Sequence, residues 1–364
     1  MCRRISRVAR VKPLHQAIIL YHPSAVIQFR EHLLRKGHAQ LVKSITFLCD
    51  SADPDDLVSL AMQAPLLEML PNLRSFSSTP LIPNPNYQKL VLKKIIRYNS
   101  LVRHVDLQEA GNGMVWEYNT ALSLVDQISL ESLRLAGKSS QSFGRPRNSF
   151  LFLQELAVRD RTFERNQITT LVDSLPNSLS SLSFTYCNGL PTNFFALIAN
   201  RFRSLTILCL LHNNTDGLES YSIASGRGTA ANLYQLRNLA LGLNAVTLEE
   251  LVQINAPLAR VLLDRLYPLS ASALAYLLAK WQISKGEFNI TVRPDGNWSK
   301  EDKVMLQVRI ASAEYTRKLI NSLQLIARTR YTDIDFWEEN AFVYSETLLA
   351  EEPHWSLFKV EESN

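Results

Sequence analysis

Three stretches, LSSLSFTYC at 179–187, LTILCLLHN at 205–213 and LRNLALGLN at 236–244, share one arrangement of side chains. Apolar residues occupy the first, fourth and sixth places of each stretch, and Cys187, Asn213 or Asn244 occupies the ninth. Alternating apolar and polar residues predict a short strand with one buried face. Recurrence of the pattern at intervals of 26 and 31 residues predicts a repeat architecture, in which each copy stacks on the next.

Weaker copies of this spacing extend the array in both directions. They begin at Val42, Leu73, Val102, Leu130, Leu153, Leu258 and Tyr331. From Val42 to Leu258, successive copies begin 22 to 31 residues apart. Apolar spacing between the strands turns helical, as at 190–202, where residue 192 or Asn193 is a candidate cap, and at 246–254. Residues 288–292 predict a further strand, and residues from about 299 to 327 predict a long helix.

The nine-residue pattern resembles the leucine-rich repeat, whose ninth-place Asn or Cys satisfies backbone groups where the chain leaves the strand. The resemblance implies an α/β solenoid, or horseshoe, of short parallel strands and outer helices over residues 22–337. The alternative is a generic α/β protein with leucine-rich helices. The sequence has only 12 glycines and no strand–GxGxxG–helix unit, which favours the repeat architecture.

The amino-terminal residues resemble a second element. CRRISRVA at 2–9, PL at 13–14 and IIL at 18–20, followed by FREHLL at 29–34 and VKSI at 42–45, are similar to the last F-box helix and first-repeat entry of fungal, basidiomycete-type F-box/leucine-rich-repeat proteins. YCNGLP at 186–191 extends the likeness. The resemblance implies a remnant at residues 1–21 that contacts an Skp-type adaptor through Arg3, Arg4, Ile5 and Arg7. A plain basic helix and an organelle presequence are the alternatives.

Two departures from that family bear on function. Ile5 stands where the family more often has Trp or Phe, and the earlier F-box helices with their Leu-Pro start are not found ahead of it. We expect a protein-recognition module resembling the substrate receptor of an Skp/cullin/F-box ubiquitin ligase. The alternative is a leucine-rich-repeat scaffold or orphan protein without ligase coupling.

Charge is unevenly distributed along the chain, whose net charge is +5. Residues 1–30 contain six Lys or Arg and no acid, whereas residues 338–364 contain seven Glu against Lys359. The acidic end is expected either to cap the last repeat or to be a disordered tail. Because no single face or helix of the body concentrates the bases, nucleic-acid binding is not expected. Association of nucleic acid with the basic amino end is a third hypothesis.

Several classes of protein are excluded or not expected. No apolar run reaches the roughly 18 residues of a membrane span. The four cysteines form no CxxC pair, which favours reduced thiols in a cytoplasmic or nuclear protein. No GxSxG, HExxH or GxxxxGK[ST] motif occurs, so we expect no enzyme, catalytic residue, metal or cofactor. Oligomeric state and client identity stay open.

The alternation within each strand predicts a recognition surface. The third, fifth and seventh residues of each copy face away from the leucine core, onto the concave side of a solenoid. These positions are charged in the middle copies and apolar in the next, a combination typical of interface centres. The candidate protein-binding residues are His104, Asp106, Arg134, Glu155, Arg159, Ile207 and Leu211. A merely solvated charged face is the alternative.

Overall fold

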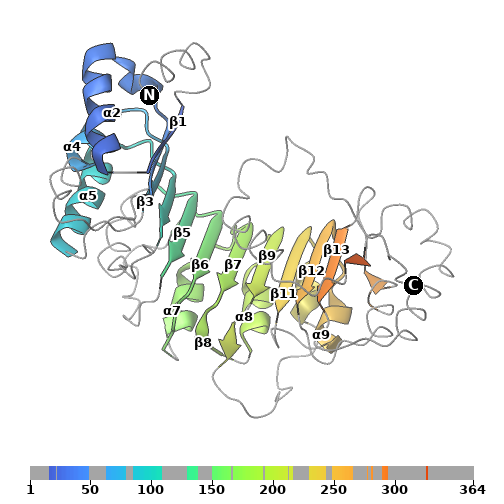
Figure 1. The fold of residues 1–364 in the computed structure, drawn as a ribbon. Coiled ribbons are helices and arrows are strands. Elements are labelled where there is room, and N and C mark those ends of the chain that lie inside the picture. Colours follow the sequence, from blue (N-terminus) through green and yellow to red (C-terminus); the bar gives the residue numbers. More distant parts are fainter. Residues whose placement is uncertain are drawn as a thin grey trace, which may run out of the picture. The chain divides into compact units, whose positions relative to one another are not determined.

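The structure, a computed structural model, describes residues 16–21, 23–48, 63–78, 85–108, 129–137, 150–164, 167–191, 193–211, 213–215, 229–242, 248–264, 277, 280–281, 289–293 and 325–326. The chain divides into two compact units, Met1–Pro176 (unit 1) and Asn177–Asn364 (unit 2). Each unit contains a parallel sheet with helices between its strands (Figure 1). The predicted α/β class with parallel strands is confirmed.

The strands of unit 1 lie side by side in chain order, and every pairing is parallel. They are β1 (Ala17–Leu20), β2 (Ser44–Phe47), β3 (Ser75–Ser78), β4 (His104–Leu107), β5 (Ser132–Ala136) and β6 (Glu155–Arg159). The connecting helices are α2 (Pro23–Lys36), the 3-10 helix η2 (His38–Leu41), α4 (Gln63–Glu68), α5 (Pro85–Tyr98) and α7 (Gln167–Ser174). Helix α4 contacts both α2 and α5, so successive connections also stack.

The register in unit 1 aligns equivalent places of successive copies. Ile45 pairs with Phe76, Phe76 with Val105, and Val105 with Leu133, all in the fourth place. Each of these side chains is almost fully buried, so the fourth place forms a continuous apolar row. β1 pairs with β2 in the same way, although its residues lie within the range 1–21 that the F-box resemblance covers and carry no copy of the repeat pattern.

Unit 2 repeats this arrangement, with strands of five residues in its main parallel sheet except for the two-residue β14 (Leu325–Ile326). Its parallel strands are β7 (Ser181–Thr185), β9 (Ile207–Leu211), β11 (Asn238–Gly242), β12 (Arg260–Asp264), β13 (Asn289–Arg293) and β14 (Leu325–Ile326). The helices are α8 (Phe194–Arg201), the 3-10 helix η4 (Thr229–Asn232) and α9 (Leu248–Gln253). β8 (Asn188–Leu190) and β10 (Asn214–Thr215) form a separate parallel pair.

The carboxyl-terminal elements confirm one prediction and correct another. β13 confirms the strand expected at 288–292. β14 lies inside the stretch expected to be helical from about 299 to 327, so that prediction is wrong at Leu325–Ile326. Periodicity alone does not separate a short apolar strand from a helical segment, and pairing with Ile290 and Thr291 decides for the strand. The copy expected at Tyr331 lies outside the described residues.

The ninth place of the repeat ties neighbouring copies together through a side chain. Asn213 Nδ2 donates to the carbonyl of Phe184 at 2.9 Å, and Asn213 Oδ1 accepts from the backbone N–H of Cys187 at 2.9 Å. The predicted role of the ninth-place Asn is confirmed here. The residue before Cys187, Tyr186, has φ 54°, and in unit 1 Asp160 at the same place also has φ 54°, so both turns enter the left-handed region.

The helix that follows this turn begins as expected but is capped differently. Asn193 is the N-cap of α8, yet its side chain makes no capping hydrogen bond. Instead its carbonyl accepts from Leu197, and the N–H of Phe194 donates to the carbonyl of Pro191. The helix is held mainly by Phe194, Phe195 and the other apolar residues that it buries against the strands.

Asn213→Ala is expected to lower the free energy of unfolding by about 2–4 kcal/mol, because a buried N–H and a buried carbonyl both lose their partner. Urea denaturation of the purified chain measures the change. Asn177→Ala, at an exposed turn, is the matched control and should change stability by less than about 0.5 kcal/mol. Equal effects of the two substitutions would contradict the role given to Asn213.

Candidate protein-interaction surface

Each strand has a core face, which carries the fourth and sixth places, and an opposite face, called here the second face, which carries the third, fifth and seventh. In unit 1 the register makes one row of the fifth-place residues. The row runs Thr46, Ser77, Asp106, Arg134, Ala157. A carboxylate and a guanidinium thus stand on directly adjacent strands, about 4.8 Å apart at the backbone.

Asp106 is held by neutral donors as well as by this cation. Ser77 Oγ donates to Asp106 Oδ2 at 3.2 Å, and Gln108 Nε2 donates to the same oxygen at 2.8 Å. The other oxygen, Oδ1, is buried and accepts no hydrogen bond from the described residues. The carboxylate is therefore fixed in position but only half satisfied.

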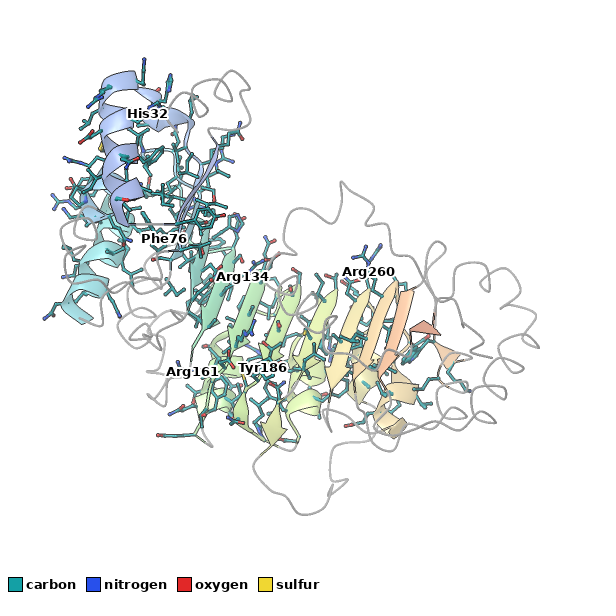
Figure 2. All side chains as sticks on the ribbon, viewed as in Figure 1. His32, Phe76, Arg134, Arg161, Tyr186 and Arg260 are labelled. Atoms are coloured by element: carbon teal, nitrogen blue, oxygen red, sulfur yellow. The ribbon has the colours of Figure 1, made fainter. Side chains whose placement is uncertain are left out.

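Arg134, labelled in Figure 2, lies on β5, between β4, which carries Asp106, and β6, which carries Glu155. Its Nη2 is 4.0 Å from Glu155 Oε2, and its charge also acts on Asp106. The side chain of Arg134 is 15% exposed and that of Glu155 is 24% exposed, so the pair is neither buried in the core nor freely solvated. Asp106, Arg134 and Glu155 form what we call the charged cluster.

Burial outweighs attraction in the electrostatics of the charged cluster. Burial raises the pKa of the Asp106 carboxyl above 3.8, against the lowering effects of Gln108, Arg134 and Ser77. Burial also lowers the pKa of Arg134, against the raising effects of Asp106 and Glu155. Both shifts have the same cause, so both charged groups are held at some cost in solvation.

The remaining predicted residues of unit 1 lie beside the charged cluster. His104 is half-buried in the third place of β4, next to Ser75 and Ser132 in register. Arg159 ends β6, and its Nε donates to Asp160 Oδ2 at 3.2 Å. Arg3, Arg4, Ile5 and Arg7 lie outside the described residues. The second face of β4, β5 and β6 therefore carries all five of the charged or imidazole residues predicted to bind a client: His104, Asp106, Arg134, Glu155 and Arg159.

The apolar part of the predicted surface is corrected in unit 2. Ile207 is partly exposed, but Leu211 is 0% exposed and joins Cys209, Ala240 and Leu262 in a buried apolar cluster. These residues come from adjacent strands, because Cys209 and Leu262 both pair with Ala240. Sequence alternation assigned Leu211 correctly to the second face, but burial there removes it from an exposed patch.

Ser77 and Gln108 contribute to the charged cluster without having been predicted as site residues. Both are uncharged, and their role depends on Asp106 standing between them. A signal was available, because Ser77 occupies the fifth place of its copy and Gln108 the seventh place of the next, two residues beyond Asp106. Only the register shows that these donors meet one carboxylate oxygen.

Two features are absent from the described part of the chain. It contains no group of three or more His, Cys, Asp or Glu side chains placed to hold a metal ion. Within the same residues, no helix has the length and apolar character needed to cross a bilayer.

Asp106→Asn tests the electrostatics of the charged cluster through pH. Because the folded pKa of Asp106 is raised, its carboxyl favours the folded state at pH below 3.8 and loses that contribution as pH rises through the folded pKa. The variant, which never ionises, should gain stability relative to the parent chain across that window. Urea denaturation from pH 3.5 to 7 measures the difference, and a difference independent of pH would contradict the assignment.

Arg134→Gln provides the companion measurement for Asp106→Asn. Loss of the cation should destabilise the chain at pH 7 by about 1–2 kcal/mol, because Asp106 and Glu155 both lose their counter-charge. The figure is modest because the pair is partly solvated and because the substitution also removes the unfavourable burial of the Arg134 charge. In the Arg134→Gln background, Asp106→Asn should be more favourable than in the parent, since Asp106 then lacks its counter-charge. Additive effects of the two substitutions would show that the groups do not interact.

Comparisons with known proteins establish no family. No family model matches the sequence, and no curated protein matches it. Among solved structures, the chain is similar to the crystal structure of the Rad7 and Elc1 complex in yeast, with a TM-score of 0.49 and 14% identity, over 88% of this chain and 82% of that chain. A likeness at this TM-score and identity is too weak to establish a function.

Proposed function

We propose that this chain is a leucine-rich-repeat solenoid that recognises a protein client on the second face of unit 1, which corresponds to the concave face of such a solenoid. The observation that carries the proposal is the charged cluster, in which β4, β5 and β6 each contribute one half-buried charged side chain at a place that the core does not need. Support for the repeat class comes from the ninth-place hydrogen bonds of Asn213.

The charged cluster suits recognition because its groups are already oriented. The parallel backbones fix the spacing of Asp106 and Arg134, and Ser77 and Gln108 hold the carboxylate. A partner that binds here meets side chains that lose little rotamer freedom. A partner bound to this face would also bury the part of the Arg134 side chain that is still exposed, and buried Arg residues often dominate interface energies. We therefore propose binding, not catalysis, as the activity of this face.

Coupling to a ubiquitin ligase is a second part of the proposal. Its support is the resemblance of residues 2–20 to the last F-box helix and the segment after it. In this proposal Arg3, Arg4, Ile5 and Arg7 contact an Skp-type adaptor while unit 1 holds the client. Cys187 and Cys209 are buried, and the four cysteines of the sequence form no CxxC pair, which supports a reducing compartment, cytoplasmic or nuclear. A scaffold without ligase coupling is the competing function.

A charge-neutral double substitution tests the client surface. Glu155→Gln with Arg159→Gln removes one acid and one base from the second face and leaves the net charge unchanged. Affinity purification of the full chain with quantitative mass spectrometry should show a defined set of proteins reduced at least about tenfold by this change. Melting temperature should stay within about 3 °C of the parent, because both side chains are partly exposed.

The matched control is Lys89→Gln with Asp173→Asn, which also exchanges one base and one acid at exposed positions of unit 1, on α5 and α7. It should retain the same proteins. Equal loss with both pairs, or no loss with either, would contradict recognition by the second face.

Binding of a purified Skp-type adaptor by residues 1–364 tests the ligase coupling. We expect binding that Arg3→Glu, Arg4→Glu and Arg7→Glu together reduce at least about tenfold, because charge reversal replaces three attractions by repulsions. Isothermal titration calorimetry measures it. No binding by the full chain would favour the scaffold function, whatever the client experiment shows.

A further inference from the structure

Unit 1 carries a row of cations outside the charged cluster. Lys43, Arg74 and Arg103 each occupy the second place of their copy, directly before β2, β3 and β4. The next residue along the row, Glu131 before β5, is acidic and lies 3.9 Å from Arg103. Three successive copies thus present a cation at one edge of the sheet, and the row ends at a carboxylate.

The backbone holds these cations in equivalent positions. The carbonyl of Lys43 accepts from Arg74 at 2.7 Å and from Ser75 at 3.0 Å. The carbonyl of Arg74 accepts from Arg103 at 2.8 Å and from His104 at 3.1 Å in the same pattern. Because the geometry repeats, the three Cα–Cβ bonds leave the sheet in the same direction, about one strand spacing of 4.8 Å apart.

Like charges at this spacing repel one another. Lys43 and Arg74 are exposed and form no ion pair within the described residues, whereas the side chain of Arg103 is 33% exposed and engages Glu131. Nearby charge adds to the repulsion, since residues 16–48, 63–78 and 85–108 contain ten Lys or Arg against three Asp or Glu. A bound anionic group would relieve it.

Exposed apolar side chains accompany the row. Leu41 is 47% exposed and lies two residues before Lys43, and Leu101 is 41% exposed and lies two residues before Arg103. Asn72, in the turn before β3, donates through Nδ2 to the carbonyl of Gln40 in the turn before β2 at 2.8 Å, which ties these two turns together. Exposed leucines therefore stand two residues before the cations in the turns that lead into β2 and β4.

We propose that this edge binds an acidic protein segment that also carries apolar side chains, and that it forms part of the client-binding surface. The proposal rests on the proposed function of protein recognition and adds the chemistry of the partner. Carboxylates of the segment pair with Lys43 and Arg74, and its apolar side chains cover Leu41 and Leu101.

The arrangement favours a protein segment over a nucleic-acid strand. The row contains only three cations and ends at Glu131, and Asp106 and Glu155 lie further along the second face, where a continuing line of phosphates would meet like charge. The exposed apolar residues near these cations, Leu41 and Leu101, are leucines, whereas single-stranded nucleic acid is usually held by stacking on aromatic side chains. A short acidic peptide fits both features.

Fluorescence anisotropy with the full chain and three labelled probes tests the proposal. The probes are a peptide of alternating Glu and Leu, a peptide of alternating Glu and Ser, and an oligothymidylate of equal charge. We expect the Glu–Leu peptide to bind most tightly, and Lys43→Gln with Arg74→Gln to weaken it at least about tenfold. Lys89→Gln with Lys93→Gln, which removes two exposed charges from α5, should weaken it less than twofold.

Each alternative result would overturn the proposal. Equal weakening by both pairs would indicate general attraction to a basic protein, and tightest binding of the oligothymidylate would indicate nucleic acid. Tightest binding of the Glu–Ser peptide would contradict the apolar contribution. A Leu41→Ser variant that binds the Glu–Leu peptide as tightly as the parent chain would contradict it too. If the Glu155 and Arg159 substitutions reduce client capture but the Lys43 and Arg74 substitutions leave peptide binding unchanged, only this inference fails. The opposite pattern would overturn the client surface alone.

Discussion

Parallel register is the constraint on which the structure depends. Each strand pairs with the strand of the next copy at equivalent places. Residues at the same place of successive copies therefore form a row across the sheet, in which neighbouring backbones are about 4.8 Å apart. At the fourth and sixth places the row is apolar and buries a continuous core. At the ninth place the same register lets Asn213 reach the backbone of the preceding copy and satisfy groups that the turn would leave unpaired.

The same register brings charged side chains together on the second face, which is not part of the apolar core. Charged residues at equivalent places of successive copies stand on adjacent strands, so they either attract or repel one another. Asp106 and Arg134 attract each other, and the pKa shifts of both show that burial of their charges is unfavourable. Lys43 and Arg74 stand in line with the same sign. These charged side chains lie outside the apolar core, and they are the ones we assign to binding.

The second faces of the two units differ in chemistry. In unit 1 the fifth places carry Asp106 and Arg134, whereas in unit 2 Cys209, Ala240 and Leu262 occupy them and are buried with Leu211. An apolar residue on this face therefore does not by itself mark an exposed patch. On this face a charged residue is a better indicator of an exposed surface than an apolar residue is, because charged side chains keep part of their solvent contact even when packed side by side.

The repeat, the strands at the matched copies and the two faces of each strand could be predicted from the amino-acid sequence, because the two-residue period of a strand and the recurrence of copies are local properties. Which residues of neighbouring copies lie in register depends on the folded chain, and so do the contacts of Ser77 and Gln108 with Asp106 and the alignment of Lys43 with Arg74. The folded chain also shows that Ala17–Leu20 and Leu325–Ile326 pair as strands and that Leu211 is buried. These outcomes depend on contacts between residues far apart in the chain, which no local pattern contains.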